Sequence, residues 1–295
     1  MKLTLLGSLG HINQYTIPAF VKAGHDVTVV TSSEKRVAAI ESIGAHAAVG
    51  SMKDTEFLTS ALTGADAAYL MLSGGFDDSA SMDETATKQA IIFRDAVRNA
   101  GVNRIVNLSS VGADQGPEVG SLHMYHIIED TLRELENVNI TFVRAVGFYS
   151  NWLANIPTIK SDHAIYRNAH AQTVNAMTDP SDIATAIIEE LPNLKSTTDV
   201  RYVVSDFQTG NQIIETLSKK LNIPDLKWVE LTDQQMLTQM EKMGMPTPFA
   251  QGMTTSNRRQ DSPDFYADLR ANLPTLGKVK FSDFAERFVS AYQNS

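Results

Sequence analysis

Two glycines near the start of the chain have the spacing of a diphosphate-binding loop. The segment Gly7-Ser8-Leu9-Gly10-His11 follows an apolar run at 3–6 and opens a stretch with helical spacing of apolar residues. Glycine allows a tight turn, and the free N–H groups of a helix N-terminus attract a diphosphate. An ordinary glycine turn is the alternative, since Asn13 replaces a third glycine. The residues expected to bind a dinucleotide are Gly7, Leu9, Gly10, His11 and Ile12.

The end of the next expected strand indicates which dinucleotide this loop would hold. NAD pockets usually place an Asp or Glu about 20 residues past the loop, where it binds the ribose 2′-hydroxyl. Here the chain reads Thr31-Ser32-Ser33-Glu34-Lys35-Arg36. Hydroxyls and cations suit the 2′-phosphate of NADP. Two alternatives stay open: Lys35 and Arg36 lie on a solvated helix face, or Glu34 is the acid that binds the ribose. We expect NADP(H) rather than NAD(H), bound by Thr31, Ser32, Ser33 and Arg36.

A parallel sheet would position these segments, and the chain has the pattern of one. Strands are expected at 3–6, 27–30, 47–49, 67–72, 104–108, 140–144 and 201–204. Helices are expected at 12–23, 34–42, 56–62, 84–100, 121–135 and 179–191, the last with Asp179 as its N-cap and Pro180 in its first turn. This alternation predicts an α/β fold with a doubly wound parallel Rossmann sheet.

The pattern changes after residue 147. Residues 148–172 lack a clear period, helices are expected at 209–221, 233–243 and 281–292, and the Met- and Pro-rich stretch 244–266 has no assignable structure. We expect residues 1–147, with about 173–205, to form the dinucleotide-binding domain. Residues 148–172 and 206–295 are expected to form a smaller, mainly helical substrate lobe.

Composition excludes several classes of function. The 295 residues carry a formal net charge of -9, which argues against nucleic-acid binding, and they include no cysteine for disulfides, thiolate catalysis or cysteine-based metal sites. No apolar run approaches the roughly 18 residues of a membrane span. His123 and His126 have no evident third ligand, so we expect no metal site. A cytoplasmic protein that acts on a small molecule is the expectation.

Six segments together carry a family resemblance: residues 7–11, 69–73, 106–112, 123–129, 142–151 and 182–184. In this order they resemble the NmrA-like branch of the atypical short-chain dehydrogenase/reductases, and within it the bacterial NADPH-dependent quinone oxidoreductases. The resemblance extends from residue 1 to about residue 205. It implies a cofactor lined by Met71, Leu72 and Ser73, with Ser109 and Ser110 near the nicotinamide. It also implies a substrate near Phe148, Tyr149 and Asn151.

One expected catalytic pair is missing. Ordinary members of the wider superfamily use Tyr-x-x-x-Lys, in which the lysine lowers the pKa of the tyrosine. Here Tyr125 is followed at that spacing by Glu129, which cannot replace lysine and which we expect on the exposed side of its helix, paired with Arg133. Tyr125 and His126 are the candidate catalytic residues, with His123 as a further proton donor. For the two histidines, the alternative is a partly exposed helix face without a catalytic role.

Two functions follow from these features. The first is an NADPH-dependent oxidoreductase that transfers hydride to a quinone or a similar small electrophile, an acceptor that needs little acid help. The second is a non-catalytic NADP(H) redox sensor that acts through a regulatory protein partner. A nucleotide-sugar epimerase or dehydratase ranks last because it normally needs the missing pair. A homodimer is compatible with any of these functions.

Overall fold

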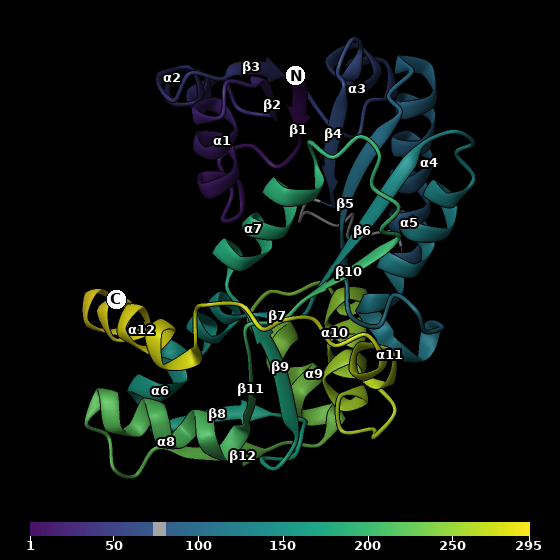
Figure 1. The fold of residues 1–295 in the computed structure, drawn as a ribbon. Helices are drawn as coiled ribbons and strands as arrows, with labels where there is room; N and C mark the ends of the chain where they lie inside the picture. Colours follow the sequence, from purple (N-terminus) through teal and green to yellow (C-terminus); the bar gives the residue numbers. More distant parts are fainter. Residues whose placement is uncertain (73–80) are drawn as a thin grey trace.

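Seven parallel strands form the central sheet of the computed structural model, which describes residues 1–72 and 81–295. The strands, in chain order, are β1 (Lys2–Leu5), β2 (Asp26–Thr31), β3 (His46–Val49), β4 (Ala67–Met71), β5 (Arg104–Ser110), β6 (Asn139–Ala145) and β10 (Val200–Val203). Their order across the sheet is β10-β6-β5-β4-β1-β2-β3 (Figure 1). The order reverses between β1 and β4, the usual place of a dinucleotide in a doubly wound sheet. The expected Rossmann-type α/β fold is therefore confirmed.

Helices cover both faces of this sheet. They are α1 (Asn13–Lys22), the 3-10 turn η1 (Glu34–Arg36), α2 (Val37–Ser42), α3 (Thr55–Leu62), α4 (Met82–Ala100), the 3-10 segment η2 (Pro117–Leu122), α5 (His123–Arg133) and α7 (Pro180–Glu190). Successive strand residues point to opposite faces, so Tyr69 joins the core under α1 and α7 while Leu70 joins the core under α3, α4 and α5. Within the described ranges, no helix is long and apolar enough to span a membrane.

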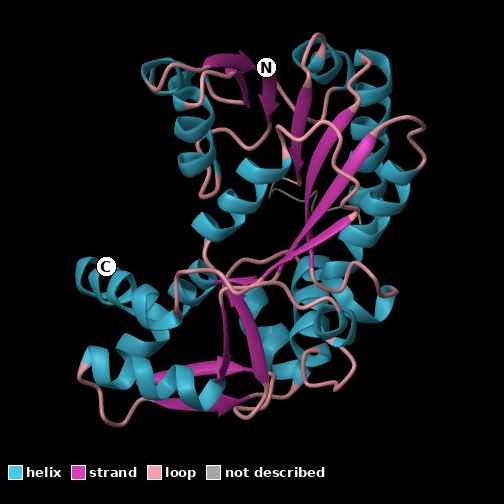
Figure 2. Ribbon diagram, in the orientation of Figure 1, coloured by secondary structure: helices cyan, strands magenta, loops and turns pink. Residues whose placement is uncertain are grey.

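The remaining elements form a second lobe below the carboxyl edge of the sheet in Figures 1 and 2. A three-stranded sheet contains β7 (Gly147–Phe148), β9 (Val174–Thr178) and β11 (Asp206–Thr209), and β8 (Ala164–Arg167) pairs with β12 (Lys227–Glu230). The helices are η3 (Tyr149–Asn155), α6 (Ile156–Asp162), α8 (Gly210–Leu221), α9 (Asp233–Lys242), α10 (Thr247–Arg259), α11 (Ala267–Ala271) and α12 (Phe281–Asn294). Residues 174–178, which belong to the range expected in the dinucleotide-binding domain, pair within this three-stranded sheet.

The stretch 244–266, which had no assignable structure from sequence, contains a regular helix. Its helix α10 begins after Pro246, where proline is well tolerated. The residues that α10 buries are Ala250, Thr254, Ser256 and Asn257. Because most of this buried face is polar, it produces no apolar period that sequence analysis detects.

The two lobes are tied together at the start of α7. Asp179 caps this helix as predicted, accepting a hydrogen bond from the Ser181 backbone N–H at 3.0 Å, and it pairs with Arg287 of α12. Burial opposes ionisation of Asp179, but these contacts outweigh burial and hold its pKa below the ordinary value. Asp182, one turn later, accepts the backbone N–H groups of Lys278 and Val279 at 3.1 and 3.3 Å.

Candidate functional site

The loop between β1 and α1 has a backbone that requires glycine at its first position. Gly7 and Ser8 both have positive φ angles, 98° and 51°. A Cβ placed on Gly7 would lie 2.7 Å from the Met71 sulfur, so a side chain there strains the backbone and also displaces Met71. The Gly10 N–H donates to the Gly7 carbonyl at 3.1 Å and closes the turn. Gly7, Gly10 and Met71, three predicted cofactor residues, therefore meet at one place.

Asn13 holds this turn from inside. Its side chain is buried, and its Nδ2 donates to the carbonyl oxygens of Leu6 at 2.9 Å and Ser8 at 2.8 Å. Its Oδ1 accepts the hydroxyl of Thr16 at 3.0 Å. The amide at the third-glycine position thus fixes two loop carbonyls, a role that sequence analysis missed because asparagine there only signalled added bulk.

The start of α1 leaves several backbone donors free. No side chain caps this helix at its N-terminus. The N–H groups of Leu9, His11 and Ile12 find no acceptor among the residues that the structure describes. Such N–H groups, together with the helix dipole, favour an anion at this position. The arrangement suits the diphosphate that the glycine spacing predicts.

The end of β2 lies against the same loop. Thr31 is buried, and its hydroxyl oxygen accepts hydrogen bonds from the Ser8 hydroxyl at 2.8 Å and the Ser33 N–H at 3.3 Å. Ser32 and Arg36 are exposed, and Arg36 forms no ion pair within the described ranges. Thr31 therefore joins the glycine turn to β2, while Ser32 and Arg36 stay available to a ligand.

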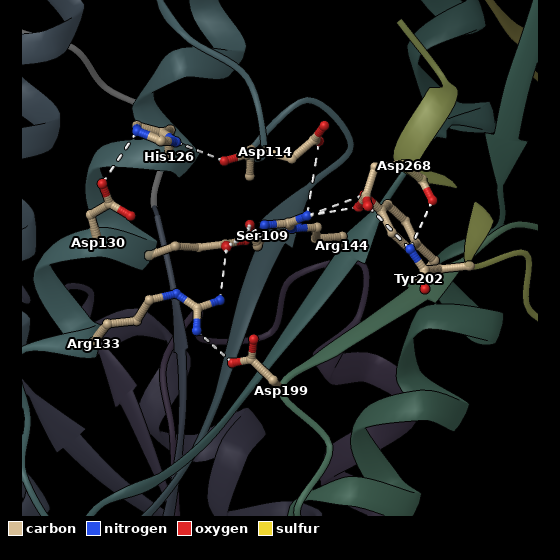
Figure 3. Close-up of polar contacts among 12 residues, drawn as sticks. Ser109, Asp114, His126, Asp130, Arg133, Arg144, Asp199, Tyr202 and Asp268 are labelled. Atoms are coloured by element: carbon tan, nitrogen blue, oxygen red, sulfur yellow. Dashed lines mark hydrogen bonds and ion pairs between the residues drawn. The ribbon is translucent and has the colours of Figure 1, made fainter. Parts of the chain in front are cut away.

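Glu129 occupies a position that differs from the sequence prediction. We expect it on the exposed side of α5, but the structure buries its side chain to 2% exposure beneath β5 and β6. Arg144 of β6 donates to both carboxylate oxygens at 2.9 and 2.7 Å, and the Ser109 hydroxyl donates at 2.5 Å (Figure 3). The predicted partner Arg133 is present at a longer 3.6 Å. The expected pairing with Arg133 is therefore confirmed, whereas the expected exposed position was wrong because the main counter-ion, Arg144, comes from another element.

Arg144 extends this network into the second lobe. Its Nη1 donates to the Tyr202 hydroxyl at 3.2 Å and to Asp268 at 3.1 Å, and the Tyr202 hydroxyl donates to the same carboxylate at 2.5 Å (Figure 3). Burial alone would lower the pKa of Arg144, but the contacts with Glu129 outweigh it and raise the pKa above its ordinary value. One buried guanidinium thus joins α5, β6, β10 and α11.

The candidate catalytic residues on α5 have different surroundings. The Tyr125 hydroxyl makes no hydrogen bond with any residue in the described part of the chain, and burial raises its pKa. His126 donates from Nδ1 to the Ala113 carbonyl at 2.9 Å, and its Nε2 lies 3.2 Å from Asp130. His123 stacks on His126 with ring centroids 5.4 Å apart. Tyr125 is therefore the candidate whose polar group stays available.

The predicted substrate residues do not form one surface. Phe148 is partly buried against the large core, and Asn151 is exposed. Tyr149 is fully buried: its hydroxyl donates to the Val279 carbonyl at 3.1 Å, and its ring stacks on Phe284 at 5.4 Å. Tyr149 thus packs inside the second lobe.

Three further residues, Leu72, Ser73 and Ser109, are predicted to line the cofactor. Leu72 is partly buried next to the end of β4, and Ser73 lies outside the described residues. Ser109 is buried with its hydroxyl committed to Glu129. Among the side chains that the structure describes, no group of three His, Asp or Glu residues could hold a metal ion.

The parallel sheet with its reversal at β1 and β4, and the glycine turn at that reversal, define a Rossmann-type α/β protein. The chain belongs to the NmrA-like family, whose model matches residues 1–283. The resemblance noted in the sequence is confirmed by this match. No curated protein matches the chain significantly.

Solved structures share the whole fold. An NADPH-dependent quinone oxidoreductase from Escherichia coli, solved with NADPH, has a TM-score of 0.77 at 18% identity, covering 97% of this chain and 99% of that one. Triphenylmethane reductase from Citrobacter sp. has a TM-score of 0.76 at 16% identity, with coverage of 98% and 100%. A nucleoside-diphosphate-sugar epimerase from Staphylococcus aureus reaches 0.77 at 14% identity, with coverage of 97% and 100%. At such identities, the similarity establishes the fold alone.

Proposed function

We propose that this protein binds NADP(H) and transfers hydride from it to a quinone or a similar small electrophile. The observation that carries the proposal is the turn at Gly7 and Ser8, which Asn13 braces and which presents free N–H groups at the start of α1. The quinone and dye reductases with this fold support the reaction class. The nicotinamide would supply the hydride, and the chain would supply binding, orientation and a proton.

The hydrogen-bond donors of the site suit this cofactor. The free N–H groups at Leu9, His11 and Ile12 suit a diphosphate. Ser32 and Arg36 are exposed where the 2′-phosphate would lie, and the residues at the tip of β2 carry hydroxyls rather than carboxylates. These features favour NADP(H) over NAD(H).

Replacing Arg36 is expected to weaken NADPH binding selectively. The Arg36→Ala protein should lose about tenfold in NADPH affinity, because a charge-assisted hydrogen bond to phosphate contributes about 1.5–3 kcal/mol. Its NADH affinity should not change, since NADH lacks that phosphate. Titration of both dinucleotides by calorimetry measures the difference. Arg98→Ala removes the same charge from an exposed position on α4 and should leave both affinities unchanged. Equal losses for NADPH and NADH would contradict the assignment.

A direct assay tests the reaction itself. NADPH oxidation is followed by nicotinamide absorbance with a panel of benzoquinones, naphthoquinones and cationic dyes. Turnover with at least one class is the expected result. Tight NADPH binding without turnover on any acceptor would contradict the oxidoreductase proposal.

Tyr125 is the proposed hydrogen-bond and proton donor to the reduced oxygen of the acceptor. The Ser109 hydroxyl already donates to Glu129, so it cannot donate to a substrate at the same time. The raised pKa of Tyr125 keeps its hydroxyl protonated at neutral pH, which suits a donor rather than a base.

Tyr125→Phe is expected to lower kcat by about tenfold with a quinone, below the 100-fold or greater range of full acid catalysis, because a quinone needs little protonation. NADPH affinity should be unchanged. The same assay on His126→Gln tests the second candidate. Its kcat should fall less, because both ring nitrogens of His126 already contact Ala113 and Asp130. A kcat of Tyr125→Phe equal to that of the wild type would remove Tyr125 from the mechanism.

A non-catalytic NADP(H) sensor is the second candidate, favoured by one observation. Glu129 stands at the lysine position and holds both Ser109 and Arg144, so the usual catalytic set is replaced by a closed ionic network. A protein partner whose affinity changes with the ratio of NADPH to NADP would support this function. A homodimer also stays a prediction, which sedimentation tests.

A further inference from the structure

Arg167 at the end of β8 lacks a carboxylate partner. Its Nη2 donates to the Asn257 side-chain oxygen at 3.2 Å, and its Nε is buried without an acceptor. No ion pair involves this side chain within residues 1–72 and 81–295. Burial lowers the pKa of Arg167, as expected for a cation held without a counter-ion. The residue as a whole is partly exposed, whereas its Nε is sealed, so an ion would reach the terminal nitrogens of the guanidinium.

The other buried arginines show how this chain normally compensates such a charge. Arg104 lies 3.3 Å from Glu190 and also donates to Thr141 at 2.9 Å. Arg144 contacts Glu129 at 2.7 Å. A guanidinium removed from water without such a partner is strongly unfavourable. Arg167 therefore carries an unmet requirement for a negatively charged oxygen.

The surroundings of Arg167 indicate what kind of ion would fit. Its guanidinium lies over the Trp152 ring at 5.3 Å from the ring centroid. Asn257 supplies an amide on the opposing helix α10. Trp152 is itself buried, at 5% exposure, so its ring holds the guanidinium in place and is not a surface for a ligand. A guanidinium fixed in this way beside an amide suits an ionised oxygen.

Helix α10 connects Arg167 with the candidate catalytic helix. Ser256, next to Asn257 in the chain, donates its hydroxyl to the Val119 carbonyl at 2.7 Å and lies 2.7 Å from the Ser121 hydroxyl. Val119 and Ser121 belong to η2, which leads directly into α5 and Tyr125. The cation and the proposed proton donor therefore lie on elements that one helix holds together.

We propose that Arg167 binds an ionised oxygen of the small-molecule substrate and makes this protein selective for acidic acceptors. That these acidic compounds are then reduced rests on the proposed oxidoreductase function. Their binding to Arg167 is measurable without any turnover. Arg167 is on this view a specificity-determining residue, because it holds the substrate at a distance from the reacting atoms.

Two naphthoquinones that differ at one ring position test the proposal. Lawsone carries a hydroxyl that is ionised at neutral pH, and menadione carries a neutral methyl group instead. Binding is titrated by calorimetry in the presence of saturating NADP, so that no turnover occurs. The wild type should bind lawsone about tenfold more tightly than menadione, the difference that one charge-assisted hydrogen bond supports.

The Arg167→Met protein should lose this tenfold preference while its menadione affinity stays unchanged. Arg167→Lys should retain part of the preference. Arg270→Met, which removes an exposed arginine from the same lobe, should behave as the wild type. Quenching of tryptophan fluorescence gives a second readout, because Trp152 lies beside the guanidinium and the chain has 2 tryptophans in all.

The thermal midpoint of unfolding separates binding from structure. Because Arg167→Met removes an uncompensated charge and keeps most of the volume, its midpoint should equal or exceed that of the wild type. A lowered midpoint with an unchanged lawsone preference would mean that Arg167 only packs on Trp152, and the proposal would be overturned. Wild-type protein that binds lawsone no better than menadione overturns it equally. Tight lawsone binding without NADPH oxidation contradicts the oxidoreductase function and leaves the anion site standing.

Discussion

A single methyl group on Gly7 is expected to remove most of the NADPH affinity of this protein. Gly7→Ala should raise the dissociation constant of NADPH at least about tenfold, since the new Cβ would lie 2.7 Å from the Met71 sulfur and either the turn or Met71 must move. The positive φ of 98° adds a backbone cost of about 1–2 kcal/mol to folding. Calorimetric titration and urea unfolding measure the two effects.

The chain contains a matched control for this substitution. Gly24 also has a positive φ, 81°, but a Cβ there meets nothing within 4 Å. Gly24→Ala should therefore carry the backbone cost alone and leave NADPH affinity intact. If Gly7→Ala bound NADPH as tightly as the wild type, the loop would not be the diphosphate site.

Glu129→Gln is expected to destabilise the protein by about 3 kcal/mol, the range for breaking a buried ion pair by removing one partner. The substitution keeps the size of the side chain but leaves Arg144 without its closest carboxylate, at 2.7 Å. Asp268 compensates part of this charge from 3.1 Å. Urea unfolding at neutral pH measures the loss of stability.

An exposed glutamate at the C-terminal end of the same helix provides the comparison. Glu134 pairs with Arg94 at 2.7 Å, but its side chain is 55% exposed. Glu134→Gln should cost no more than about 1 kcal/mol, because solvent screens surface pairs. Equal costs for the two substitutions would show that the Glu129 pair is solvated. Replacing Glu129 and Arg144 together by leucine and methionine should recover part of the loss.

Cofactor binding and the replacement of the usual catalytic lysine both bear on whether this protein is an oxidoreductase. Gly7→Ala asks whether the protein holds a dinucleotide, and Glu129→Gln asks what stands where a catalytic lysine is usual. The carboxylate of Glu129 accepts the Ser109 hydroxyl at 2.5 Å, and the glutamine Oε1 can still accept it, but the amide nitrogen cannot accept from Arg144. Any change in turnover of Glu129→Gln must therefore be compared with its folded fraction.

The central sheet and the start of the site were predictable because their signals are local. The apolar runs that became β1, β2, β4 and β5 each lie within one short window, and the glycine turn needs only the residues around Gly7. The N-cap at Asp179 is local in the same way, since a carboxylate binds the N–H groups of the next turn.

Helix α10 was not predictable from periodicity. It buries Thr254, Ser256 and Asn257, whose partners lie on distant segments such as η2 and β8. Polar residues become acceptable inside a protein when they find hydrogen-bond partners. Those partners are present only once the second lobe has folded, so the helix has no apolar stripe in the sequence.

The sequence by itself determined that this chain forms a Rossmann-type sheet with a glycine turn suited to a dinucleotide. Tertiary structure alone decided the surroundings of the charged residues: Glu129 is buried because β6 brings Arg144 to it, and no carboxylate from the described elements reaches Arg167. The physical reason is that backbone conformation follows from neighbouring residues, whereas the energy of a charge depends on solvent and counter-ions that distant segments supply or withhold.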